Sequence, residues 1–206
     1  MYLFVAAVEQ ELENLYQLAP AGATHDFCAC GVGMVAAAAN LSRVLQAFDG
    51  GQKCEVVFLG SCGSLRKRQE ILSPVIAKDV SLVDFLTCEK KAYVPELVHK
   101  SYRADLELSK KVLGSDSFYR GSFYSTIGIS SHEVCELTYS KETSGEFENM
   151  ELFGVAEACA QHSVSWSALS VVTNEIGPNA HSQWLDNKNE ASMLTTKLIF
   201  KNLLSV

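Results

Sequence analysis

Apolar, strand-forming runs recur along this chain and alternate with stretches of helical periodicity, and this alternation constrains the fold more than any other feature. Residues 54–59 are almost continuously apolar, which is typical of a strand that is buried on both faces. Residues 9–18 instead carry Leu12, Leu15 and Leu18 at helical spacing. Strands that alternate with helices predict an α/β fold of stacked layers.

The same patterns predict where the individual elements lie. Strands are expected at residues 2–8, 25–30, 54–59, 74–84, 123–129 and 164–172. Helices are expected at residues 9–18, 34–48, 104–112, 149–161 and 181–204. No linker, low-complexity segment or internal repeat divides this series. We therefore expect residues 1–206 to form one domain.

The charge balance argues against several classes of partner. Seventeen Lys and Arg residues stand against 24 Asp and Glu residues, for a formal net charge of −7. An acidic chain repels a phosphate backbone, so nucleic acid is not expected as a partner. No apolar run approaches the roughly 20 residues that a bilayer span requires. The first eight residues lack a basic start, so no secretory signal is expected.

The seven cysteines are scattered along the chain and odd in number. We expect them to be reduced and mostly buried, which predicts a cytoplasmic protein. Cys28 and Cys30 are not followed by a second pair at the spacing of zinc ligands. The five histidines do not cluster with cysteine or acid either, so neither a metal nor another cofactor is expected.

In layered α/β folds, ligands bind beyond the carboxyl ends of the strands. The segments that follow the predicted strands are also the least core-like parts of the sequence, which predicts a small-molecule site there. These segments are residues 9–11, 31–33, 60–63, 130–134 and 173–177.

Several residues in or near these segments can serve either a ligand or the fold. Glu9 and Glu11 suit a helix N-terminus, but a carboxylate there can also orient and deprotonate water. Glu148 and Glu151 are spaced to share a helical face, either as charge at a helix start or as acceptors for two adjacent ribose hydroxyls. Asn174 can cap a turn or read a purine edge, because an amide both donates and accepts.

Five segments, in order along the chain, resemble the purine nucleoside phosphorylase superfamily, and in particular its hydrolase branch. That branch includes methylthioadenosine/S-adenosylhomocysteine nucleosidase and futalosine hydrolase. Residues 7–11, Ala-Val-Glu-Gln-Glu, resemble the nucleosidase pattern Ala-Met-Glu-Glu-Glu. The other segments are Gly-Val-Gly-Met-Val-Ala-Ala at 31–37, Gly-Ser-Cys-Gly at 60–63, Phe-Glu-Asn-Met-Glu at 147–151 and Val-Thr-Asn at 172–174.

This resemblance implies a three-layer α/β/α fold with a central mixed β-sheet, a purine nucleoside as ligand and a homodimer. It also implies roles for individual residues. Glu11 would activate the attacking water, with Ser61 beside it. Glu151 would bind the ribose hydroxyls, and Asn174 would face N7 of the purine. The remaining substrate-binding residues implied are Met150, Cys62, Gly63, Glu133 and Val134, of which the last two would flank the base.

Two departures from the family pattern narrow the expected reaction. Phosphorylases carry a phosphate-binding arginine just before the Gly-Ser-Cys-Gly segment, and this chain has Phe58 there. Carboxylates stand where their second phosphate arginine lies, so water is the expected nucleophile. Asn174 replaces the aspartate that is usual in adenine-directed nucleosidases. The asparagine favours a 6-oxopurine, which makes futalosine the expected substrate and menaquinone biosynthesis the expected pathway.

Other functions stay open on the sequence alone. The chain can act on aminodeoxyfutalosine, or as a methylthioadenosine/S-adenosylhomocysteine nucleosidase. It can also be a nucleoside-binding protein without catalysis, because Asn174 cannot deliver a proton as a carboxylic acid does. A phosphorylase is disfavoured by Phe58.

Overall fold

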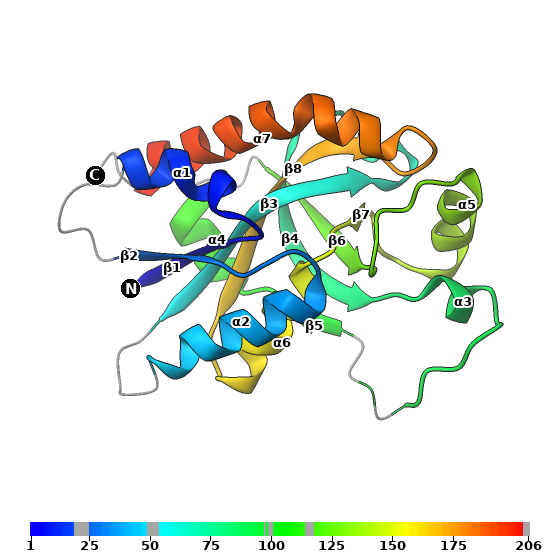
Figure 1. Ribbon diagram of the computed structural model, residues 1–206, viewed down its shortest axis with the longest axis horizontal. Coiled ribbons are helices and arrows are strands. Elements are labelled where there is room, and N and C mark those ends of the chain that lie inside the picture. The colour runs from blue at the N-terminus through cyan, green and yellow to red at the C-terminus, as the bar shows by residue number, and fades with distance from the viewer. Residues whose placement is uncertain (19–24, 49–53, 97, 99–100, 114–117, 204–206) are drawn as a thin grey trace.

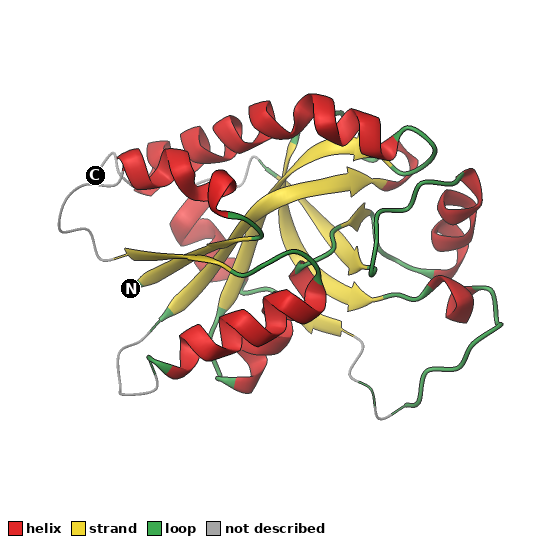
Figure 2. Ribbon diagram, in the orientation of Figure 1, coloured by secondary structure: helices red, strands yellow, loops and turns green. Residues whose placement is uncertain are grey.

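One eight-stranded sheet lies between two layers of helices in the computed structural model (Figures 1 and 2). The structure describes residues 1–18, 25–48, 54–96, 98, 101–113 and 118–203. The strands are β1 Tyr2–Ala6, β2 His25–Ala29, β3 Glu55–Ser64, β4 Pro74–Leu82, β5 Ser101–Arg103, β6 Tyr119–Ser125, β7 Phe147–Glu148 and β8 Trp166–Glu175. The helices are α1 Glu9–Leu18, α2 Met34–Gln46, α3 Phe85–Cys88, α4 Leu106–Leu113, α5 Glu133–Glu142, α6 Leu152–Gln161 and α7 Ala180–Leu203, with a 3₁₀ turn at Leu65–Lys67.

The sheet is mixed, and part of it closes on itself. β8 pairs in parallel with β3 and antiparallel with β4. β4 pairs in parallel with β6, β6 in parallel with β7, and β7 antiparallel with β3. These pairings return to β3, so the strands form a closed ring, while β1 and β2 extend in parallel from its outer side. The mixed sheet of the predicted fold is thus confirmed.

Alternation along the central strands supplies a core on each face of the sheet. On β1, Leu3 and Val5 belong to the cluster that packs against α2 and α6. Phe4 and Ala6 belong to the opposite cluster, with α1, α4 and α7. Because both faces are covered, the central strands are apolar throughout rather than alternating with polar residues.

The predicted elements match the structure where periodicity is strong and differ at strand ends. The helix at residues 9–18 is confirmed at both ends, and α7 follows the predicted 181–204 closely, although residue 204 lies outside the described residues. β3 and β8 run further than their apolar runs, to Ser64 and Glu175. Residues 60–63, which were expected to follow the strand, instead continue in β3 and pair with β8.

The cysteines are unpaired, and Cys30, Cys54, Cys62 and Cys159 are buried. This agrees with the expectation of thiols that are mostly buried. Among the helices that the structure describes, none is long and apolar enough to span a membrane.

Candidate active site

A cavity of about 380 Å³ opens where β3 and β8 run side by side and where α1, α6 and α7 begin. All of the predicted site residues line it except Glu133 and Val134. Its walls are Ala7, Val8, Glu11, Val32, Phe58, Gly60, Ser61, Cys62, Gly63, Ile129, Glu148, Asn149, Met150, Glu151, Asn174, His181 and Trp184. Across the described part of the chain, no group of three His, Cys, Asp or Glu side chains is placed to hold a metal ion.

Glu11 stands in the first turn of α1, directly beyond the end of β1. Its Oε2 accepts hydrogen bonds from the backbone N–H groups of Ala7, at 3.1 Å, and Val8, at 3.3 Å. Part of the side chain faces the cavity, yet the surrounding protein desolvates the carboxylate. This desolvation, together with the nearby charge of Glu151, raises the pKa of Glu11 to about 7. A base with a pKa near the working pH is well suited to take a proton from water.

Glu151 reaches the same cavity from the N-terminus of α6. Its side chain is buried, and its Oε1 accepts a hydrogen bond from the Gly33 N–H at 2.9 Å. Burial raises the pKa of this carboxyl as well. Two carboxylates, Glu11 and Glu151, therefore face one cavity and repel each other. Such a pair favours a ligand that develops positive charge between them.

Two glycines let the Gly33 amide approach Glu151. Gly33 has a positive φ of 84°, in the region that favours glycine. Gly154 lies in the first turn of α6 against the start of α2, where a Cβ atom would overlap the carbonyl oxygen of Met34. The missing side chain lets the two helices pack closely and brings their N-termini together. In the sequence, Gly154 is an isolated glycine within a predicted helix, and only this feature could have indicated the close packing of the two helices.

Asn149 is a site residue that sequence reasoning missed. Its Oδ1 accepts from the N–H groups of Glu151, at 2.8 Å, and Leu152, at 2.7 Å, so it caps α6. Its Nδ2 donates to the Ser61 carbonyl oxygen at 3.0 Å. One side chain therefore ties the start of α6 to β3. An asparagine just before an apolar helical run is a recognisable N-cap signal, and it could have identified this residue.

The expectation that Glu148 and Glu151 share a helical face is wrong. Glu148 belongs to β7, because the cap at Asn149 starts the helix only at Leu152. Its buried carboxylate accepts from Thr126 Oγ1 at 3.1 Å, from Ser130 Oγ and from the Ser130 N–H at 3.0 Å. With its oxygens occupied in this way, Glu148 holds the loop after β6.

Asn174 lines the same cavity as the carboxylates of Glu11 and Glu151. It is within β8, where the register with β3 shifts between Cys62 and Gly63. Its Oδ1 accepts from Thr173 Oγ1 at 3.0 Å, and its Nδ2 donates to the Glu175 carbonyl at 3.2 Å. An amide nitrogen has a second hydrogen, so Asn174 can still donate to a ligand. A Cβ at Gly63 would lie 2.8 Å from this nitrogen, so the glycine makes room for the amide.

Glu133 and Val134, which the family resemblance places beside the base, do not line the cavity. Both lie in the first turn of α5 and are exposed. β6 ends at Ser125, and Glu148 draws the following loop inward, so Ile129 is the residue from this segment that reaches the cavity. The side chains from Glu133 onward belong to α5, and no residue of that helix lines the cavity.

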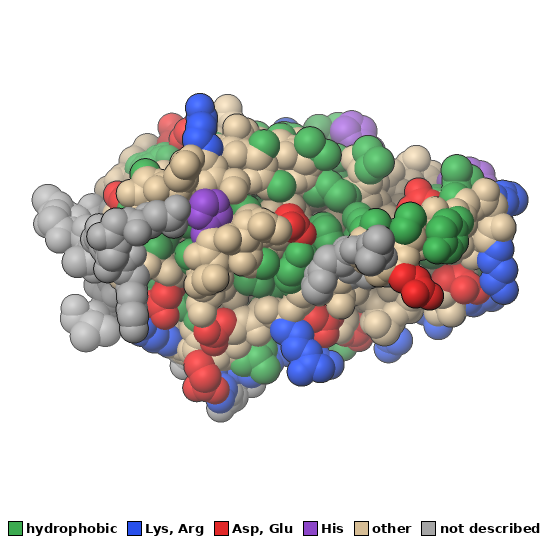
Figure 3. All heavy atoms as spheres, turned by 90° about the horizontal axis from the view of Figure 1, so that it is seen from below, with side chains coloured by type: hydrophobic (Ala, Val, Ile, Leu, Met, Phe, Trp, Pro, Cys, Tyr) green, Lys and Arg blue, Asp and Glu red, His purple; other side chains and the backbone are tan. Residues whose placement is uncertain are grey.

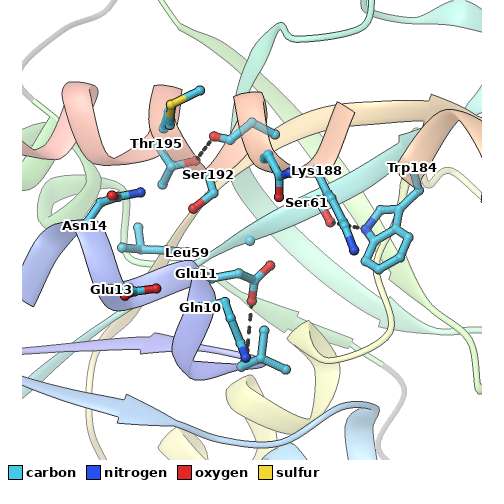
Figure 4. Close-up of a pocket in the computed structure, with 15 residues that line it drawn as sticks. Gln10, Glu11, Glu13, Asn14, Leu59, Ser61, Trp184, Lys188, Ser192 and Thr195 are labelled. Atoms are coloured by element: carbon cyan, nitrogen blue, oxygen red, sulfur yellow. Dashed lines mark hydrogen bonds between the residues drawn. The ribbon is translucent and has the colours of Figure 1, made fainter. Parts of the chain in front are cut away.

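Phe58 and Ser61 complete the floor of the cavity on β3. Phe58 is fully buried. Its aromatic ring stands at the position where the family resemblance places the phosphate-binding arginine of a phosphorylase. Among the described residues that line the cavity, none is Lys or Arg. Ser61 Oγ accepts a hydrogen bond from Trp184 Nε1 at 3.3 Å, which joins α7 to this floor (Figure 4).

Solved structures with the same fold include nucleosidases. Helicobacter pylori 5′-methylthioadenosine/S-adenosylhomocysteine nucleosidase aligns over 100% of this chain and 98% of its own, with a TM-score of 0.83 and 17% identity. Helicobacter pylori futalosine hydrolase aligns over 100% and 97%, with a TM-score of 0.82 and 16% identity. The Neisseria meningitidis methylthioadenosine/S-adenosylhomocysteine nucleosidase, in complex with methylthio-immucillin-A, aligns over 100% and 99%, with a TM-score of 0.82 and 18% identity.

Comparison of the sequence alone identifies the superfamily and not an individual relative. Among curated protein sequences, none matches this chain. The phosphorylase superfamily, however, matches residues 22–204, which is most of the chain. The match covers the glycine segment at residues 31–37, the Gly-Ser-Cys-Gly segment, Glu151 and Asn174. The fold brings these parts together around the cavity. The chain therefore belongs to the phosphorylase superfamily.

Proposed function

We propose that this protein is a nucleosidase that hydrolyses the N-glycosidic bond of a purine nucleoside. The observation that carries the proposal is the pair of desolvated carboxylates, Glu11 and Glu151, on one cavity. Cleavage of this bond leaves the sugar with oxocarbenium character, as in glycoside hydrolysis. Fixed negative charge stabilises that state more than it stabilises the neutral substrate.

Each group has a defined part in the proposed reaction. Glu151 accepts hydrogen bonds from the ribose hydroxyls, with Met150 packed against the sugar. The electron pair of the C1′–N9 bond leaves with the base, and Asn174 donates a hydrogen bond to the base as charge develops on it. Water held by Glu11 and Ser61 attacks C1′, and Glu11 takes its proton. The departing base takes a proton from solvent at a ring nitrogen and Glu11 releases its proton to solvent, so the products are the free base and the free sugar.

Water is favoured over phosphate by the charge of the cavity. Its two carboxylates repel an anion, and among the lining residues that are described no Lys or Arg offsets them. Phe58 contributes a ring where an arginine would bind phosphate.

Futalosine is the substrate we propose, with a role in menaquinone biosynthesis. The solved relatives include both a futalosine hydrolase and methylthioadenosine/S-adenosylhomocysteine nucleosidases at nearly equal identity, so they do not decide between the two. Asn174 favours the 6-oxopurine of futalosine, because its amide can donate to O6 or N7 without being an acid. Methylthioadenosine or aminodeoxyfutalosine is the second candidate, since adenine nucleosides are named for most of these relatives.

We also propose a cytoplasmic homodimer that needs no cofactor. The unpaired thiols suit a reducing compartment. Val32, at 60% exposed, and Ile129, at 37%, line the cavity and are open to solvent in one chain. Hydrophobic side chains also lie open on the face shown in Figure 3. Among other apolar residues, Val35 is 80% and Ile127 87% exposed. A second copy that covers such residues would close the mouth of the cavity.

Base release from a panel of nucleosides tests this proposal. Purified protein is incubated with futalosine, aminodeoxyfutalosine, methylthioadenosine and inosine, and the free base is quantified by chromatography. We expect the highest kcat/KM with futalosine. Preference for the adenine nucleosides would overturn the use of Asn174 as a 6-oxopurine determinant. Tight nucleoside binding without base release would identify a binding protein instead of an enzyme.

A further inference from the structure

A second cavity, of about 600 Å³, lies between α1 and α7 and meets the nucleoside cavity at the proposed base, Glu11. We call it the α1–α7 chamber. The two cavities share the lining residues Val8, Glu11, Gly60, Ser61 and Trp184. The chamber alone is lined by Gln10, Glu13, Asn14, Leu59, Lys188, Asn189, Ala191, Ser192, Met193 and Thr195.

Trp184 and Ser61 lie at one end of the chamber, and Asn14 and Thr195 lie at the other (Figure 4). The indole of Trp184 lines both cavities and donates its hydrogen bond to Ser61. The ammonium group of Lys188 lies 4.7 Å from the centre of the same ring. These contacts hold Trp184 in place as a partition between the two cavities.

Polar side chains stand on the face of α7 that lines the chamber, among apolar neighbours such as Leu59 and Met193. Lys188, Ser192 and Thr195 recur on α7 at the spacing of one helical face, the spacing at which a packed helix usually carries apolar residues. Ser192 Oγ is buried and has no hydrogen-bond partner among the described residues. A space of this size can hold several waters, and the side chains of Asn14, Lys188 and Asn189 offer them hydrogen-bonding groups.

The chamber also gives a route to Glu11 that a bound nucleoside leaves open. A nucleoside between Glu151 and Asn174 fills the first cavity, including its mouth at Val32 and Ile129. The chamber approaches Glu11 from between α1 and α7, and its outer lining includes the exposed residues Glu13 and Lys188. Water can therefore reach the base while the substrate is in place.

We propose that the α1–α7 chamber is a water-binding site that supplies the nucleophile to Glu11. This inference rests on the proposed hydrolysis. The chamber is lined by hydrogen-bonding groups of both charges, Glu11, Glu13 and Lys188, which suit small hydroxylic molecules such as water. Methanol belongs to this class and can report on the site.

Methanol that enters through the chamber competes with water for the same sugar carbon. Its oxygen forms a bond to C1′ as the C1′–N9 bond breaks, and the bonding electrons leave with the base. The methanol proton passes to Glu11, and the base gains a proton at a ring nitrogen. The product is the methyl riboside, and its ratio to free sugar measures how the two nucleophiles share the site.

Ser192→Leu fills the chamber with a larger apolar side chain, and Lys197→Leu, on the exposed side of α7, is the matched control. In Ser192→Leu we expect kcat to fall about tenfold or more, with KM changed by less than about twofold. We expect the ratio of methyl riboside to free sugar to fall as well, because methanol is larger than water. The control should keep wild-type kcat, KM and product ratio.

Several results would overturn the proposal. A folded Ser192→Leu variant with wild-type kcat and wild-type product ratio would show that water arrives elsewhere. A raised KM with unchanged kcat would show that the chamber holds part of the nucleoside, such as its 5′ substituent. Should Ser192→Leu not fold, Asn14→Leu fills the chamber from the opposite helix under the same expectations. If wild type releases no base from any nucleoside, the proposed function itself fails and the chamber proposal falls with it.

Discussion

The two sides of the nucleoside cavity are built from different chemistry. The side of α1 and α6 presents two carboxylates, Glu11 and Glu151, each anchored by backbone N–H groups and each desolvated. The side of β8 presents a neutral amide, Asn174. Charge that is fixed before the reaction acts on the transition state, whereas a neutral hydrogen-bonding edge distinguishes one base from another. Substitutions on the first side should therefore change the rate, and those on the second side should change selectivity.

The largest effect is expected for Glu11→Gln, which removes the proposed base. We expect kcat to fall by about 10³-fold, within the range typical of a lost general base. The matched control is Glu9→Gln in the same helical turn, whose carboxylate contacts the exposed hydroxyl of Tyr16. It should stay within about twofold of wild type by the same assay. A Glu11→Gln enzyme with near wild-type kcat would remove Glu11 from the mechanism.

Glu151→Gln is expected to lower kcat/KM by about 10²-fold, because the amide keeps the contact with Gly33 but not the charge. The fold should tolerate it, since a buried like-charge pair is relieved. Glu148→Gln provides the contrast, because the carboxylate accepts three hydrogen bonds from Thr126 and Ser130, whereas an amide has only one accepting oxygen. It should cost about 1–3 kcal/mol of unfolding free energy, measured by denaturant titration. A larger stability loss in Glu151→Gln than in Glu148→Gln would reverse the roles assigned to the two carboxylates.

The raised pKa of Glu11 predicts a pH dependence of both activity and stability. Because the base acts when deprotonated, kcat/KM should rise with pH until about pH 7 and then level off. For stability, the pKa is 4.5 unfolded and about 7 folded, so the protonated form is favoured by folding. Its stabilising contribution is complete below pH 4.5 and lost as the pH rises through 7.

Glu11→Gln removes this dependence. Relative to wild type, the variant should gain about 1–3 kcal/mol of stability between pH 5 and pH 8, measured from thermal unfolding at each pH. Parallel stability curves for the two proteins would contradict a raised pKa at Glu11.

The smallest effect is expected for Asn174→Asp, on the neutral side of the cavity. The carboxyl group can supply a proton to an adenine, so the ratio of kcat/KM for methylthioadenosine to that for futalosine should rise about tenfold. The rate with the better substrate should change less than in either carboxylate variant. An unchanged ratio would mean that another residue selects the base.

The sequence predicted the fold best where periodicity is strong. The helical spacing of Leu12 and Leu15 predicted the first and last residues of α1 correctly, because those side chains are buried in the core. The ends of β3 and β8 were missed, because Ser61 and Asn174 break the apolar pattern while backbone pairing continues. α5 was missed because it has little apolar periodicity, and only Thr138 and Tyr139 of it are buried.

The candidate site was predictable only in part, for a related reason. The rule that ligands bind at strand ends, together with the family resemblance, pointed to Glu11, Ser61 and Asn174, which line one cavity. It could not identify the contact of Gly33 with Glu151, because those residues are 118 positions apart and meet only when α2 packs on Gly154. It also assigned Glu148 to the wrong element, since the capping role of Asn149 was not recognised.

The central claim is that the carboxylate side of the cavity directs water to the sugar. The most direct test is to identify the sugar product formed from futalosine with and without inorganic phosphate. We predict free base and free sugar in phosphate-free buffer, at a rate that added phosphate does not raise. Release of base only in the presence of phosphate, with a sugar 1-phosphate as the product, would contradict the account.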